Sequence, residues 1–250
     1  MPKLANPTTT RKKPSLSTIM AVVFFALFVA IYYMITAKSP VPYYLYGLLF
    51  AIPCIVFALI TYLKAKEKIN PDFSFRLTVW LIPIFFYGMC FGVVICSVSL
   101  ATVQVQDVSQ YRHVMRASGY PNDEHISFFP PEIPEDATDV VFHYNPAFLQ
   151  GGEFFLIKFK TNEQDIMAYQ KQFSAQAQCY GSKRQLAEQN SEVYIPSFSR
   201  VGYQNDLPED FIIYILYSKP YSSNNWNHGT LRLVAINAKH SEIIFYAGSW

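Results

Sequence analysis

Three long apolar segments occupy the N-terminal part of the chain. Leu16 to Ala37, Tyr43 to Leu63 and Leu77 to Leu100 contain no Asp, Glu, Lys, Arg or His. A bilayer core about 30 Å thick is crossed by roughly 20 apolar helical residues, and a helix pairs its own backbone polar groups there. We therefore predict three transmembrane helices over 16–37, 43–63 and 77–100. Pro53 and Pro83 are expected to bend the second and third helices, because proline lacks a backbone donor.

The basic residues around these segments predict their orientation. The tail over residues 1–15 carries four Lys or Arg, the 64–76 loop carries another four, and the 38–42 turn carries only Lys38. The positive-inside rule then places the tail and the 64–76 loop in the cytoplasm and the C-terminal part outside it. An alternative is cleavage of the first segment as a signal peptide after "ITA" at 35–37, which the length of its apolar run disfavours.

A strip of small side chains follows one face of the third segment. Gly88 and Gly92 form a G-x-x-x-G motif, and Cys96 extends it by one turn. Such strips let two helix backbones approach closely in lipid. The strip predicts a helix-packing site, either for another helix of this chain or for an envelope protein partner. The spans carry no ionisable side chain, which favours anchoring in the lipid bilayer over ion transport.

After the third segment the pattern changes to shorter apolar runs with a period of two. Residues 106–138 predict a juxtamembrane helix that ends near Gly119, followed by a proline-rich extended linker. Residues 139–250 predict one extracytoplasmic domain. Its expected strands are Asp139 to Tyr144, Glu153 to Lys160, Phe211 to Tyr217, Leu231 to Asn237 and Glu242 to Ala247. A helix from about Asn162 to Cys179, with a capping box at Thr161 and Gln164, completes an α+β fold with a mainly antiparallel sheet.

Composition agrees with this division and excludes one class of partner. Of the 250 residues, 51% are hydrophobic and only 15% are charged, whereas soluble proteins average about 25% charged residues. The net charge of +2 is too small to indicate a nucleic-acid partner. Three of the four cysteines (Cys54, Cys90 and Cys96) lie in apolar segments, so the domain, which holds only Cys179, cannot contain a disulfide framework.

Candidate chemistry is sparse. The chain lacks the common catalytic and phosphate-binding motifs, and its five histidines do not have metal-ligand spacing, so we predict no enzyme, cofactor or metal. Cys179 is expected to be a buried structural thiol, although pairing with a histidine would make it a nucleophile. The 222–229 loop is the candidate recognition site, with Asn225, Trp226 and His228. In the alternative, Trp226 folds back to cap the edge of the sheet.

A resemblance adds a location. The segment "FFPPEIPEDATDVVFHYNPAFLQGGEFFLIKFKTNEQDIMAY", at about 128–170, resembles small uncharacterised bacterial envelope proteins, several of them lipoproteins. In those proteins an I-P-x-x-A segment leads into two strands and a helix. The resemblance implies a bacterial envelope location and brings no known activity. Because the bulky Ile95 precedes Cys96, no lipobox is present, and the helices must anchor the chain.

These observations favour a bacterial inner-membrane protein whose outer domain binds a ligand or a protein. One alternative is an accessory subunit of an envelope complex that docks through the third helix. A weaker alternative is an envelope hydrolase.

Overall fold

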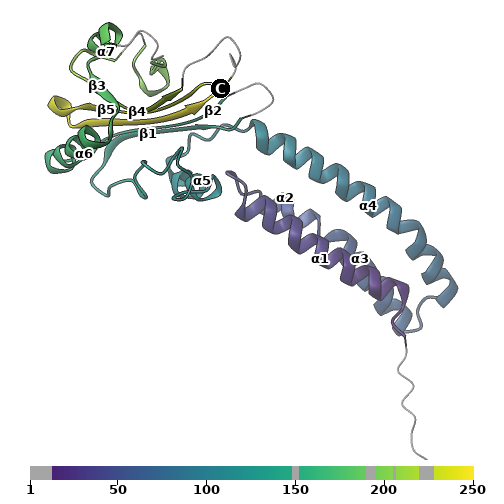
Figure 1. The fold of residues 1–250 in the computed structure, drawn as a ribbon. Helices are drawn as coiled ribbons and strands as arrows, with labels where there is room; N and C mark the ends of the chain where they lie inside the picture. Colours follow the sequence, from purple (N-terminus) through teal and green to yellow (C-terminus); the bar gives the residue numbers. More distant parts are fainter. Residues whose placement is uncertain (1–12, 148–151, 190–194, 205–206, 220–227) are drawn as a thin grey trace, which may run out of the picture. The chain divides into compact units, whose positions relative to one another are not determined.

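The computed structural model describes residues 13–147, 152–189, 195–204, 207–219 and 228–250 (Figure 1). The chain forms two compact units. One comprises residues 1–37 and 42–96, and the other comprises residues 38–41 and 97–250. The division confirms the predicted layout of apolar helices followed by an α+β domain.

The N-terminal unit consists of helices that are long and apolar enough to cross a membrane, as expected of an integral membrane protein. The candidate spans are 16–37, 44–65 and 71–99. They correspond to the helices α1 (Leu16–Ala37), α2 (Tyr44–Leu49), α3 (Ile52–Ala65) and α4 (Pro71–Thr102). Large side chains on their surfaces are unusually exposed, among them Trp80 at 73% and Tyr87 at 72%. An apolar surface of this kind is unsuited to water and suited to lipid.

The second span is broken just before Pro53. α2 ends at Leu49, and the backbone N–H groups of Phe50 and Ala51 donate to the carbonyls three residues earlier, Gly47 at 3.2 Å and Leu48 at 3.0 Å. A proline cannot donate a helical hydrogen bond and collides with the carbonyl of the preceding turn. The bend predicted at Pro53 is therefore a short break between α2 and α3. α4, in contrast, continues as one helix through Pro83.

Aromatic rings hold the apolar helices together. Phe24 of α1 and Phe57 of α3 are buried, with ring centroids 5.3 Å apart, and Phe85 of α4 meets Phe57 edge-on at 5.6 Å. Edge-on contacts suit aromatic rings because the positive ring edge faces the negative ring face. One polar contact accompanies them, since the Thr61 hydroxyl donates to the Ser17 hydroxyl at 2.9 Å.

The C-terminal unit contains one six-stranded sheet in the order β1-β2-β6-β5-β4-β3, with every neighbouring pair antiparallel. Its strands are β1 (Thr138–Asn145), β2 (Glu153–Lys160), β3 (Cys179–Gly181), β4 (Ile212–Lys219), β5 (Thr230–Asn237) and β6 (Glu242–Ser249). Its helices are η1 (Val108–Gln110), α5 (Tyr111–Ala117), α6 (Glu163–Gln176), α7 (Lys183–Gln189), η2 (Ser199–Val201) and η3 (Ala238–His240). Five of the strands occur where the sequence predicts them, whereas β3 and α7 were not predicted.

Both faces of the sheet are covered, which makes two cores. α5 and α6 lie on one face and α7 on the other (Figure 1). The first core, under α5 and α6, includes Phe142, Phe155, Ile157, Phe159, Phe173 and Phe245. The second core includes Leu156, Leu186, Phe198, Val201, Leu233 and Ile244. Successive residues of a strand point to opposite faces of the sheet. The residues on both faces of β2 and β6 are therefore largely apolar.

The structure corrects two details of the prediction for residues 106–138. The juxtamembrane helix ends near Gly119 as expected but is shorter than expected. The backbone of Val105 pairs with Tyr144 of β1 at 2.9 and 2.8 Å, and the helical part consists of η1 and α5. The expected extended linker is instead part of the first core. Ile126 and Phe129 are at most 2% exposed, and the ring of Phe129 lies 5.6 Å from that of Phe245.

The predicted start of α6 needs a correction as well. The N-cap is Asn162, whose side-chain oxygen accepts from the backbone N–H of Asp165 at 2.9 Å, and not Thr161 with Gln164. Asparagine is among the best N-cap residues because its side chain satisfies a free N–H of the first turn. The Thr161 hydroxyl donates instead to the Asp165 carboxylate at 3.0 Å.

Candidate functional site

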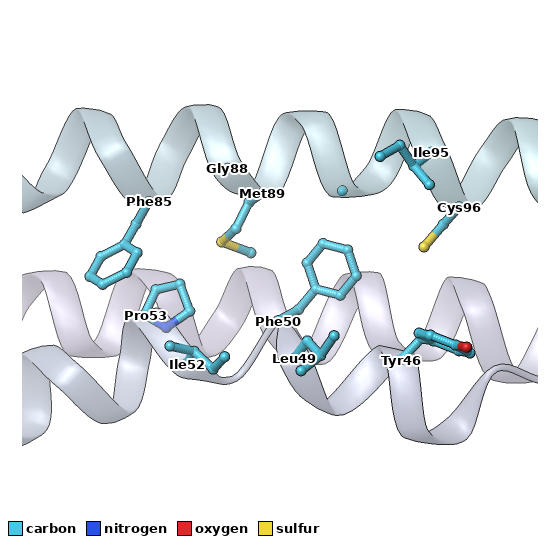
Figure 2. A pocket seen from close by; sticks show the side chains of 11 residues that line it. Tyr46, Leu49, Phe50, Ile52, Pro53, Phe85, Gly88, Met89, Ile95 and Cys96 are labelled. Carbon is cyan, nitrogen blue, oxygen red and sulfur yellow. The ribbon is translucent and has the colours of Figure 1, made fainter.

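The small-residue strip of α4 faces the second span of the same chain. Gly88, Gly92 and Cys96 line an apolar cavity of about 410 Å³ together with residues of α2 and α3. Figure 2 shows Phe50 and Met89 pointing into this space from opposite sides. A Cβ on Gly92 would lie 3.0 Å from the Phe50 ring, whereas a Cβ on Gly88 would meet no atom within 4 Å. Docking of a partner helix on this strip stays a prediction.

The predicted recognition loop is described only at its end. Asn225 and Trp226 lie outside the described residues, and His228 is exposed. The next residue, Gly229, accepts a hydrogen bond through its carbonyl from the backbone N–H of Trp250 at 3.0 Å. The end of the loop therefore adjoins the residue that follows β6.

A second cavity lies at the same end of the sheet. The register pairs Glu153 at the start of β2, and Thr230 at the start of β5, with Ser249 at the end of β6. The cavity, of about 600 Å³, opens on the face of the second core. Its lining consists of Phe154, Leu156, Pro196, Ser197, Ser199, Arg200, Tyr246 and Trp250. Aromatic and aliphatic groups thus meet two hydroxyls and one guanidinium, a mixture typical of ligand sites.

The 196–201 segment that forms one wall of this cavity is held from both sides. Phe198 and Val201 are buried in the second core, at 1% and 2% exposed. On the other side, the His143 Nε2–H of β1 donates to the Arg200 carbonyl oxygen at 3.0 Å. Burial lowers the pKa of His143, and the neutral ring still supplies the donor that this bond needs. The backbone of Arg200 is consequently fixed against the sheet.

The side chain of Arg200 stacks on an aromatic ring. Its guanidinium carbon lies 4.3 Å from the centroid of Phe154, within the range of a cation–π contact. Across the described residues, no carboxylate lies within 4.0 Å of this guanidinium. Arg112 and Arg184, in contrast, pair with Glu132 and Glu188.

The remaining candidate residues are not brought together. His113 lies 2.7 Å from the carbonyl oxygen of Ser39, and His240 lies 3.7 Å from Asp210. In the described part of the chain, no group of three His, Cys, Asp or Glu could hold a metal ion. Cys179 is in the short edge strand β3 and not at the end of a helix, and it is only half-buried. Burial nevertheless raises the pKa of its thiol, which keeps it protonated and weakly nucleophilic.

A second group of perturbed residues lies on the first-core face. Burial raises the pKa of Glu153, although the Tyr144 hydroxyl donates to its carboxylate at 3.2 Å and opposes the shift. Burial also lowers the pKa of His125, whose Nε2 has no hydrogen-bond partner among the described residues. Perturbed groups of this kind occur at functional sites and in structural networks alike.

Sequence reasoning missed the Arg200 cavity. Its residues come from β2, from β6 and the following Trp250, and from the 196–200 segment, and nothing in their spacing brings them together. The available signal was weak: a proline and two serines around an aromatic residue, Phe198, are typical of a loop that packs on a core through one side chain. The pairing of this loop with β2 depends on tertiary structure alone.

No family model, curated protein or solved structure matches this chain. Any proposal about its function therefore rests on the geometry and chemistry of the chain itself.

Proposed function

We propose that this chain is a bacterial inner-membrane protein whose C-terminal domain lies outside the cytoplasm and binds a small ligand. The distribution of basic residues supports this orientation. The three apolar helices serve as its anchor. The observation that carries the binding role is the cavity of about 600 Å³ at the end of the sheet, which is within the usual range for ligand sites.

Two further features support binding at this cavity. Its wall is fixed in place by Phe198 and by the bond from His143 to the Arg200 carbonyl, so little ordering accompanies binding. The loop that the sequence marks for recognition ends at Gly229, next to the cavity residue Trp250. The cavity and the described end of the loop therefore belong to one end of the domain.

The proposal is tested by screening small-molecule fragments against the full chain in detergent micelles by ligand-observed NMR. Ser197→Trp places a bulky ring in the cavity and should abolish binding of the fragments that contact it. Ser174→Trp, on the exposed face of α6, is the matched control and should bind like the natural chain. The site would be rejected if every fragment bound S197W and the natural chain equally, or if no fragment bound at all. Turnover of a bound fragment would reject a purely binding role.

A further inference from the structure

The strongest chemical feature of the cavity is a cation that no residue of the described chain neutralises. Arg200 lines the cavity and rests on the Phe154 ring at 4.3 Å, whereas Arg232, which also stacks on an aromatic ring, donates to the Glu124 carbonyl at 2.7 Å. A guanidinium presents planar donors that fit two oxygens of one carboxylate or phosphate. Stacking on Phe154 fixes the plane in which those donors point.

The neighbouring groups extend this recognition beyond a bare charge. The Ser197 hydroxyl oxygen accepts from the Ser199 backbone N–H at 3.3 Å, and no bond from its hydrogen to another described residue is formed, so that hydrogen can donate to a ligand oxygen. On the sheet side, Leu156 is buried and Tyr246 is half-buried, and their aliphatic and aromatic carbons give this wall apolar surface opposite the polar groups of the 196–200 segment. A ligand that joins an anionic group to an apolar group would therefore use both kinds of surface.

We propose that the cavity binds a carboxylate attached to an apolar group, with Arg200 as the anion anchor and Phe154 as its support. This inference rests on the proposed binding role of the same cavity. A carboxylate fits better than a phosphate, because it carries a single negative charge and Arg200 is the one cation among the described residues that line the cavity. Both a free aryl or alkyl carboxylic acid and the C-terminus of a peptide with an apolar last residue have this chemistry.

The test measures binding of matched probes to the full chain in micelles by isothermal titration calorimetry. The probes are N-acetylphenylalanine, its amide, and the acid and amide of acetyl-Ala-Ala-Ala-Phe. The acids should bind at least about tenfold more tightly than the amides, since a hydrogen-bonded charge is lost in the amide. Tighter binding of the tetrapeptide acid than of N-acetylphenylalanine would identify a peptide terminus as the source, and equal binding would identify a small acid.

Variants separate the anchor from general effects of charge. Arg200→Gln should weaken binding of the acids to the level of the amides and leave the amides unchanged. Arg200→Lys keeps the charge but loses the planar donors, so it should restore only part of the affinity. Arg184→Gln removes the same charge from the exposed α7 and should bind the acids like the natural chain.

The outcomes distinguish failure of this inference from failure of the binding role. If the amides bind as tightly as the acids, or if R200Q leaves the acids unaffected, while S197W abolishes binding, the cavity is a ligand site but does not select carboxylates. If no probe binds and no fragment responds to S197W, both proposals are rejected.

Discussion

At the scale of single residues, Lys158 and Glu242 form a largely buried ion pair in the second-core face. Their side chains are 16% and 6% exposed, Nζ lies 3.4 Å from Oε1, and the Tyr203 hydroxyl donates to the same oxygen at 2.8 Å. Burial raises the pKa of Tyr203, and the Glu242 carboxylate adds to this increase. Removing one member of such a pair strands the other charge away from water.

Glu242→Gln should therefore destabilise the domain by about 3 kcal/mol, because Lys158 keeps its charge without a counter-ion. Thermal unfolding of the full chain in micelles, followed by near-ultraviolet circular dichroism, measures the change. Lys160→Gln is the control, since the Lys160–Asp139 pair at the surface is screened by water and contributes little. Equal shifts in the two variants would contradict a buried role for Glu242.

His125 predicts a pH dependence of stability. Burial, with a smaller contribution from Arg232, lowers the pKa of the folded imidazole below its ordinary value of 6.5, and Asp123 opposes the shift. As the pH falls from 6.5 towards the folded pKa, the unfolded chain binds a proton that the folded chain does not, so stability decreases. Urea unfolding at about pH 7.5 and about pH 5.5 should show this loss reduced in His125→Gln. The exposed His228→Gln should keep the natural loss, and an unchanged loss in H125Q would contradict the prediction.

At the scale of elements, the sequence predicted what local patterning determines. In α6, Ile166 and Phe173 have the helical spacing of residues that share one face, and both are buried. The N-cap was misassigned because Thr161 and Asn162 are both good caps, and only the chain's approach to α6 selects between them. The proline-rich part of residues 106–138 was predicted to be a linker because of its prolines and acids. Phe129 nevertheless packs on Phe245, because burial of its ring is favourable compared with exposure to water.

The two glycines of α4 should respond differently to substitution. Gly92→Ala places a methyl group 3.0 Å from the Phe50 ring and is expected to cost about 1 kcal/mol in helix packing, whereas Gly88→Ala enters open space and should be neutral. Unfolding of the helices in increasing sodium dodecyl sulfate, followed by far-ultraviolet circular dichroism, measures the difference. Equal effects would show that Gly92 does not pack on the Phe50 ring as described.

The same glycines test the accessory-subunit hypothesis. If the strip docks a helix of another envelope protein, affinity purification from crosslinked native membranes should recover a stoichiometric partner with the intact chain. The Gly88→Ile, Gly92→Ile double variant should lose it, because bulky side chains prevent close backbone approach. A partner retained by the double variant, or no partner with the intact chain, would argue against docking at this strip.

At the scale of the whole molecule, the spans were predictable and the cavity was not. Length and apolarity alone determine whether a segment can cross a bilayer, so the three spans follow from the composition of each segment. The Arg200 cavity requires the strand order that places β6 beside β2, together with a loop from residues far along the chain. No local pattern encodes that pairing, because strand partners are chosen by the combined packing of both faces.

The orientation of the chain is the last prediction, and it decides where the proposed ligand is found. Four basic residues in the tail and four in the 64–76 loop predict that both are cytoplasmic and that the domain is outside. In a background with the four natural cysteines replaced by serine, Lys171→Cys on the exposed face of α6 should react with a membrane-impermeant maleimide in intact cells. Lys66→Cys, in the loop after α3, should react only after the membrane is permeabilised. The reverse pattern would place the Arg200 cavity in the cytoplasm, and its carboxylate ligands would then have to be sought among cytoplasmic acids.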